Sequence, residues 1–137
     1  MKNRIFCRLE AGMGLGNQLW QIASTYGIAE SIGADHGILG LQDFKATHFL
    51  DLRPNSCRLL ALETDELQYI NEKQFFDPDI NFHFNLFDQS LYNHRYRESI
   101  ITGLLQDERY LSSNLPFSYN GKNFNFDFES ALICNVR

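Results

Sequence analysis

The first quarter of the chain combines a short apolar run with a helical pattern of apolar positions. Residues 5–9 are long and apolar enough for a buried strand. After a glycine-rich stretch, apolar residues recur every three or four positions, as on one face of a helix, until Gly33. The apolar positions are Leu19, Ile22, Ala23, Tyr26, Ala29 and Ile32, and the opposite face carries Gln21, Ser24, Thr25 and Glu30. Residues 1–33 are therefore predicted to be a strand, a turn and a helix of about four turns.

A second apolar run at 37–41 follows this helix directly. Two strands joined by a helix are parallel in most proteins, so the run predicts a β-α-β unit and an α/β fold. The later patterns are shorter, and no linker divides the chain. They predict a helix at 63–74, a loop at 75–85, a strand at 99–105, a helix beginning between Asp107 and Tyr110, a turn and loop at 116–125 and a strand at 131–136.

Composition narrows the function classes. The chain has 137 residues, one domain by size, and a formal net charge of −5, which argues against a broad basic surface for nucleic acid or anionic membranes. Its three cysteines are too few and too scattered for a disulfide framework, and no C-x-x-C pair indicates zinc. No apolar run near the start is long enough for a signal peptide or a membrane helix. We therefore expect a cytoplasmic protein, at most peripheral to the inner membrane.

The glycine-rich stretch is Gly12-Met13-Gly14-Leu15-Gly16-Asn17-Gln18. A turn between a strand and a helix brings free backbone N–H groups and the positive helix end to one point, which suits a phosphate or another polar group. Glycines also permit positive φ and close approach of a ligand. The dinucleotide pattern G-x-G-x-x-G fails because Asn17 stands at its last glycine, and no Gly-Lys-Ser/Thr follows for a P-loop. Ligand binding and simple packing of helix on strand both remain open at this point.

Three segments resemble the family-11 glycosyltransferases, the α-1,2-fucosyltransferases. Residues 12–21, GMGLGNQLWQ, are similar to the family's opening signature G-G-L-G-N-Q-[LM]-F-Q, and residues 103–110, GLLQDERY, look like its G-Y-F-Q-S-E-K-Y segment. The final ICNVR, residues 133–137, resembles the strand that leads into its H-x-R-R-G-D motif, cut after the first Arg. The chain departs from the pattern at Met13, Trp20 and Asn135, and the rest of the third motif is absent.

The resemblance implies a truncated chain: residues 1–130 as the Rossmann-like N-terminal domain of a GT-B-type glycosyltransferase, and 131–137 as the first strand of a missing nucleotide-binding domain. It implies transfer of L-fucose from GDP-fucose to the 2-hydroxyl of a galactose-terminated acceptor, with inversion and without metal or another cofactor. Nucleic acid is not an expected partner. The 137 residues alone are expected not to transfer fucose at a useful rate, because a GT-B cleft closes between two domains.

The same resemblance suggests the site residues. Gly14, Gly16 and Asn17 are assigned to the donor side, and Arg137 to the diphosphate, where fixed guanidinium groups stabilise the departing charge. Supporting roles are expected for Gly12, Gln18 and Gln106. For Gln18, tying down the loop and capping the helix are both open. Contact of Gln106 and Glu108 with a ligand is an alternative, but a helix start with Glu108 as a capping residue is favoured. No residue is identified as a general base.

Other candidates favour structural roles. Asp77-Pro78-Asp79 has the form of a D-x-D metal motif, but its proline and aromatic surroundings predict a turn. His36, His48, His83 and His94 lack the spacing of metal ligands. Three other functions stay open: a fragment that only binds, a βαβ domain of another enzyme class that binds NAD or ATP, and a structural or partner-binding domain.

Overall fold

The computed structural model describes residues 4–47, 50–52, 58–59, 67–93, 98–119 and 122–125. Its main body is a five-stranded sheet in the order β4-β2-β1-β8-β5, in which all neighbours are parallel. The strands are β1 (Arg4–Arg8), β2 (Asp35–Leu39), β4 (Arg58–Leu59), β5 (Gln68–Asn71) and β8 (Glu98–Thr102). The predicted strand 131–136 and Arg137 lie outside the described residues.

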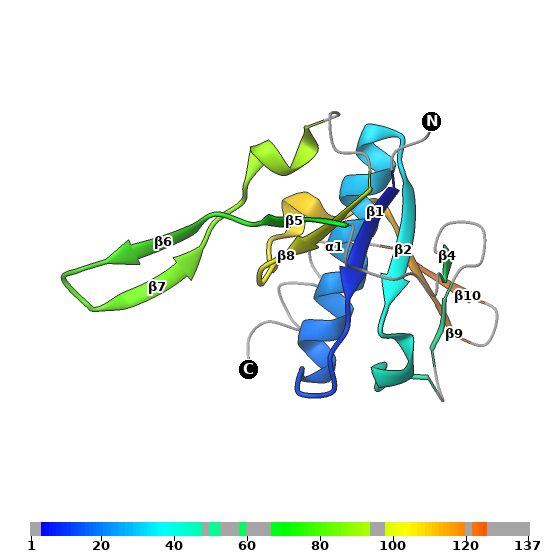
Figure 1. The fold of residues 1–137 in the computed structure, drawn as a ribbon. Coiled ribbons are helices and arrows are strands. Elements are labelled where there is room, and N and C mark those ends of the chain that lie inside the picture. Colours follow the sequence, from blue (N-terminus) through cyan, green and yellow to red (C-terminus); the bar gives the residue numbers. More distant parts are fainter. Residues whose placement is uncertain are drawn as a thin grey trace.

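The predicted β-α-β unit and the α/β class are confirmed. Helix α1 (Leu15–Ile32) joins β1 to β2 and lies against one face of the sheet (Figure 1). It has eighteen residues, one turn more than predicted, because it begins inside the glycine-rich stretch, and it ends at Gly33 as the sequence indicates. Strand β2 begins and ends two residues earlier than predicted, because the chain enters the short 3-10 helix η1 (Leu41–Asp43).

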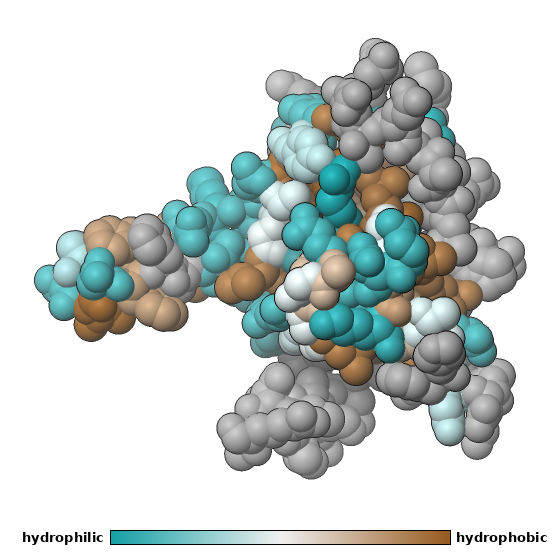
Figure 2. All heavy atoms as spheres, turned by 60° about the horizontal axis from the view of Figure 1, so that its bottom comes forward, coloured by the Kyte–Doolittle hydropathy of each residue, from teal (hydrophilic) through white to brown (hydrophobic). Residues whose placement is uncertain are grey.

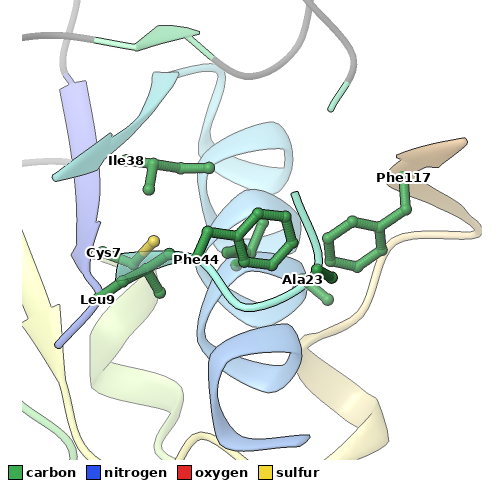
Figure 3. Packing of buried hydrophobic residues seen from close by; sticks show 8 residues of the cluster. Cys7, Leu9, Ala23, Ile38, Phe44 and Phe117 are labelled. Atoms are coloured by element: carbon green, nitrogen blue, oxygen red, sulfur yellow. The ribbon is translucent and has the colours of Figure 1, made fainter. Parts of the chain in front are cut away.

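Helix α1 is covered on more than one side. Toward the sheet, Ile22, Ala23, Ile28 and Ala29 are buried among strand residues. Figure 3 shows the opposite boundary of one of these clusters, where Phe117 points toward Ala23 from strand β9 (Asn114–Tyr119). Three residues of the predicted polar face are buried as well: Gln21 is 6% exposed, and Ser24 and Thr25 are 0% exposed, whereas Glu30 is exposed. These three side chains therefore face other segments of the protein.

The remaining strands form two small antiparallel sheets. Strand β9 pairs with β3 (Asp51–Leu52) and β10 (Lys122–Asn125), and β6 (Gln74–Asp77) pairs with β7 (Phe82–Asn85) in a hairpin that projects from the body (Figure 1). Three predictions were wrong here. Residues 67–74 are extended and not helical, because β5 pairs with β8, and both 75–85 and 116–125 contain strands where loops were expected.

The predicted features between β7 and β9 are mostly present. Residues 78–81 form the turn that the sequence predicts around Pro78. The strand predicted at 99–105 is β8, which ends at Thr102 because Gly103 and Leu105 both have positive φ, at 128° and 52°. The helix expected near Asp107 is a single 3-10 turn, η4 (Glu108–Tyr110), and another such turn, η3 (Gln89–Tyr92), precedes β8.

Candidate functional site

The glycine-rich turn lies where the strand order of the sheet reverses. From β1 the chain crosses to β2 on one side, while β8 pairs with β1 on the other side. Loops that follow two such strands diverge at the carboxyl edge of the sheet, and ligands of open α/β sheets bind in the crevice between them. Here these loops are the glycine-rich turn after β1 and residues 103–107 after β8. Figure 2 brings this edge forward and shows hydrophilic residues gathered across its centre.

The first turn of α1 has no side-chain cap. Its N-cap residue is Gly14, no capping hydrogen bond from a side chain is present among the described residues, and the turn carries no acidic residue. The first backbone N–H groups of a helix have no partner within the helix, and they carry the positive end of its dipole. Gly14, Gly16 and Asn17 are all exposed. This end of α1 is thus open to an anionic or hydrogen-bond-accepting group.

The fold does not require glycine at the three positions of this turn. A Cβ built on Gly12, Gly14 or Gly16 meets no atom of the described structure within 4 Å. None of the three has φ in the left-handed region, so the expected use of positive φ is absent, and Gly14 has an ordinary extended backbone at φ −69°. What these glycines supply is uncovered backbone, as close approach of a ligand requires.

Gly103, in the second segment, is different. A Cβ there would lie 2.6 Å from Cβ of Glu72, and its φ of 128° is one that side chains rarely adopt. Packing and backbone conformation therefore both demand glycine at 103. The two motifs that carry the family resemblance use their glycines for different purposes.

Gln18 holds the glycine-rich turn from beneath. Its side chain is fully buried, and its Nε2 donates to the carbonyl oxygens of Glu10, at 3.3 Å, and Asp43, at 2.7 Å. Its Oε1 accepts from the backbone N–H of Lys45 at 2.9 Å. The amide thus links the loops that follow β1 and β2, and it does not cap α1. Among the two roles open from sequence, this geometry corresponds to tying down the loop.

The two motif segments meet at Asn17. Gln106 Nε2 donates to Asn17 Oδ1 at 2.5 Å, across 89 residues of sequence. Deeper along the same helix, Gln21 Nε2 donates to the carbonyl of Gly103, and Ser24 Oγ donates to the carbonyl of Leu105 at 2.6 Å. Gln21 and Ser24 of α1 therefore dock the loop that follows β8. Gln106 orients Asn17, and both side chains remain exposed.

Leu105 stores strain next to this contact. Its φ of 52° lies in the left-handed region, which is costly for a leucine, although its side chain is fully buried. Its backbone is held on both sides, because its N–H donates to Glu72 Oε1 at 3.0 Å and its carbonyl accepts from Ser24. Strained residues that their surroundings hold this firmly cluster at binding and catalytic sites. The strain fixes where the adjacent Gln106 side chain emerges.

Glu72 is the centre of the hydrogen-bond network beneath the loop, and no sequence pattern marks it as a functional residue. Its carboxylate is 5% exposed and accepts from Leu105 N, from Asn85 Nδ2 at 3.0 Å and from the Tyr110 hydroxyl at 2.6 Å. Tyr110 accepts in turn from Asp88 N–H at 2.7 Å. Burial, and then the Glu72 carboxylate, raise the pKa of Tyr110 above its ordinary value, so the phenol stays protonated as a donor.

An apolar cavity of about 330 Å³ adjoins the first turns of α1. Gly16, Leu19, Trp20 and Ala23 form its helix side, and Leu50, Leu111, Leu115 and Phe117 form the remainder. The cavity therefore places an apolar surface beside the exposed backbone of Gly16. It also places the single tryptophan of the chain near the turn.

Comparisons with family models, curated proteins and solved structures found no match to this chain. The resemblance to fucosyltransferases thus rests on the quoted residues, and the fold is described without a family.

The other residues considered from the sequence have structural positions. Asp77 and Asp79 lie in the turn between β6 and β7, where Asp79 N–H donates to Asp77 Oδ1 at 2.9 Å. No group of three or more His, Cys, Asp or Glu within the described ranges could hold a metal ion. Glu108 is not the cap of η4, because Asp107 takes that position and accepts from Arg109 N. Among the described segments, no helix is long and apolar enough to cross a membrane.

His36 belongs to the core beneath α1. It is 4% exposed, its Nε2 lies 2.6 Å from Thr25 Oγ1, and its ring meets that of Tyr26 edge to face. Because Thr25 Oγ1 also donates to the carbonyl of Gln21 at 2.6 Å, His36 Nε2 must be the donor to Thr25. Burial lowers the pKa of His36 to about 3, so the ring is neutral and structural.

Proposed function

We propose that this chain is the N-terminal, Rossmann-like part of a GT-B-type glycosyltransferase similar to the α-1,2-fucosyltransferases, and that its glycine-rich turn binds GDP-fucose. The reaction would be transfer of L-fucose to the 2-hydroxyl of a galactoside, with inversion. One observation carries the proposal most directly: the hydrogen bond from Gln106 to Asn17 joins the two segments on which the resemblance depends. Asn17 and Gln106 are in contact although they are 89 positions apart in the sequence.

The chemistry of donor cleavage fits this end of the helix. When the sugar–phosphate bond breaks, negative charge develops on the departing GDP, and fixed backbone donors and a positive helix end stabilise it. The uncapped first turn of α1 offers such donors, and no acidic side chain of that turn competes for them. Gly14 and Gly16 leave this backbone uncovered. The donor oxygens can therefore approach to hydrogen-bonding distance.

Asn17 is the side chain best placed to contact the donor. Its Oδ1 is committed to Gln106, which leaves its amide N–H groups to donate to a hydroxyl or phosphate oxygen. In this arrangement Gln106 positions Asn17, and Gln18 fixes the turn by its hydrogen bonds to the backbone of Asp43 and Lys45. Arg137, the expected diphosphate contact, lies outside the described residues.

Binding titrations test the proposal. The fluorescence of Trp20 reports events next to Gly16, because the two residues line the same cavity. GDP-fucose and GDP are titrated beside NAD and ATP, and preferential binding of the guanine nucleotides is expected. Preferential binding of NAD or ATP would instead identify a βαβ domain of another enzyme class. No response to any nucleotide would refute donor binding and favour a structural or partner-binding role.

A pair of glycine variants then locates the site. Gly16→Ala adds a methyl group that the described structure accommodates, so the thermal midpoint should be retained while GDP-fucose binding weakens. Gly33→Ala, at the other end of the same helix, strains a residue with φ of 73° and should lower the midpoint without a specific loss of binding. If both variants lose binding only in proportion to their lost stability, the turn serves packing alone.

A further inference from the structure

Among the arginine side chains that the structure describes, Arg8 differs from Arg4 and Arg109 because it forms no ion pair with another described residue. Arg4 pairs with Glu98, and Arg109 pairs with Asp107 at 2.6 Å. For Arg8, no carboxylate of the described residues lies within salt-bridge distance, and its Nε is buried without a hydrogen-bond partner there. A buried donor that stays unsatisfied costs free energy that a bound acceptor would recover.

Arg8 lies at the carboxyl edge of the sheet, next to the crevice between the loops that follow β1 and β8. It is the last residue of β1, immediately before the loop that leads into the glycine-rich turn. Side chains two apart on a strand share a face, so Arg8 lies on the face of Phe6, opposite to α1. This face holds a second buried cluster formed by Phe6, Leu39, Leu67 and Ile100. Arg8 is thus at the carboxyl edge of the sheet, on the other side of the crevice from the helix.

Tyr69 fixes the direction of the guanidinium. The Arg8 guanidinium carbon lies 5.8 Å from the centre of the Tyr69 ring, within the range of a cation–π contact. Tyr69 belongs to β5, which is separated from β1 by β8, and it pairs with Ile100 in the middle of β8, so Arg8 extends across β8 to reach it. Tyr69 is 50% exposed and leaves the outer side of this pair open to solvent. The contact holds the guanidinium beside Tyr69, on the face of the sheet opposite to α1.

Two features at this edge favour an anion, although the whole chain is acidic and Glu10 lies two residues after Arg8. Arg8 is the last residue of β1, and the uncapped, positive end of α1 comes shortly after it in the chain. The two lie on opposite faces of the sheet, near the carboxyl end of β1. A guanidinium presents donors in a fixed fork that matches two phosphate oxygens, and this geometry suits a diphosphate better than a single hydroxyl.

We infer that Arg8, oriented by Tyr69, is an anion-binding residue that contacts the diphosphate of the ligand held by the glycine-rich turn. The identity of the ligand as GDP-fucose rests on the proposed function, whereas the affinity of Arg8 for a diphosphate group does not. Arg8 supplies a guanidinium within the described part of the chain, on the strand that leads into the turn.

Calorimetric titration with inorganic pyrophosphate, GDP and guanosine tests the inference. Arg8→Gln removes the charge, and Arg4→Gln is the matched control, because it removes a charge from the same strand and face at the opposite edge. Arg8→Gln should weaken pyrophosphate and GDP about tenfold to a hundredfold, as expected for loss of a charge-assisted hydrogen bond, and leave guanosine unchanged. Arg4→Gln should bind all three like the parent chain.

The outcomes separate this inference from the proposed function. If the parent chain binds pyrophosphate through Arg8 but shows no preference for GDP, the anion site stands and the fucosyltransferase proposal fails. If GDP binds and Arg8→Gln binds it equally well, the proposed function stands and the inference is wrong. Failure of the parent chain to bind either pyrophosphate or GDP overturns the inference outright.

Two further variants test the inference if Arg8→Gln fails to fold. Arg8→Lys keeps the charge and the apolar stem but lacks the fork, so it should fold and still bind pyrophosphate more weakly. Tyr69→Leu removes the cation–π contact and should weaken pyrophosphate but not guanosine. Parent-like pyrophosphate affinity in both variants would also contradict the assignment.

Discussion

At Gly27 the backbone of the segment after β8 lies directly against α1. A Cβ built there would lie 1.9 Å from the carbonyl oxygen of Tyr110 and 2.9 Å from the backbone nitrogen of Ser112. Both contacts are with backbone, so no side chain can rotate away. We predict that Gly27→Ala forces α1 and η4 apart and weakens the hydrogen bonds from Gln21 and Ser24 that dock the loop.

The size of the effect follows from how firmly both partners are held. Relieving the contact requires a shift of more than 1 Å from the present 1.9 Å. Tyr110 is 1% exposed, and its hydroxyl is bonded to Glu72 and Asp88, so η4 resists the shift. Overpacking of this kind costs about 3 kcal/mol, at the upper end of its usual range. Against it, alanine stabilises a helix interior by about 1 kcal/mol relative to glycine, which leaves a net loss of about 2 kcal/mol.

Urea unfolding followed by circular dichroism measures this loss, and Gly16→Ala is the matched control. Both variants replace a helical glycine by alanine, but a Cβ on Gly16 meets nothing within 4 Å in the described structure. The control should unfold at the same or a higher urea concentration than the parent chain. Equal stability of the two variants would show that the close approach of Tyr110 to α1 does not exist in solution.

Three further predictions concern buried groups and metals. Because burial lowers the pKa of His36 from 6.5 to about 3, the unfolded chain binds a proton between these values that the folded chain does not, so stability is lost as pH falls. The free energy of unfolding should fall by about 2 kcal/mol between pH 7 and pH 5 from this group, and His36→Gln should flatten the profile; an unchanged slope would exclude the assignment. Burial raises the pKa of the Cys7 thiol to about 12, so in a Cys57→Ser, Cys134→Ser background native protein should not react with a thiol reagent at pH 8, and reaction as fast as in urea would contradict its burial. Binding of GDP-fucose should persist in EDTA, and a loss that manganese or magnesium restores would indicate a metal-dependent site.

Local patterns sufficed for the part of the fold that carries the glycine-rich turn. The strand, turn and helix from β1 to α1 form from residues close in sequence, and their periodicity indicates each element. The segment 67–74 was mispredicted because its strand β5 is defined by pairing with β8, about thirty residues later. Strand β9 was hidden by Pro116, which breaks strand patterns in sequence. The structure accommodates Pro116 where the register with β10 shifts between Asn123 and Asn125.

The sequence motifs predict the exposed residues of the candidate site, but not the contacts between them or the buried residues beneath them. The motifs mark both Asn17 and Gln106, but nothing in the sequence indicates that they form a hydrogen bond. Glu72 was missed because an isolated glutamate in a mixed segment normally indicates a solvated surface. Its role depends on the convergence of Leu105, Asn85 and Tyr110, which only the fold brings together.

The glycines also show the difference between what the sequence indicates and what the structure requires. In sequence, Gly16 and Gly103 are equivalent, because each belongs to a motif segment and either one could serve packing or a ligand. In the structure, Gly103 is required by its φ of 128° and by Glu72, whereas no described atom lies within 4 Å of a Cβ on Gly16. Gly16 lies in the first turn of α1, where a glycine lowers the stability of the helix relative to alanine, so a glycine there that packing does not need has a cost. The ligand that the turn is proposed to bind gives that cost a reason, because a methyl group on Gly16 would stand between the ligand and the first backbone donors of α1.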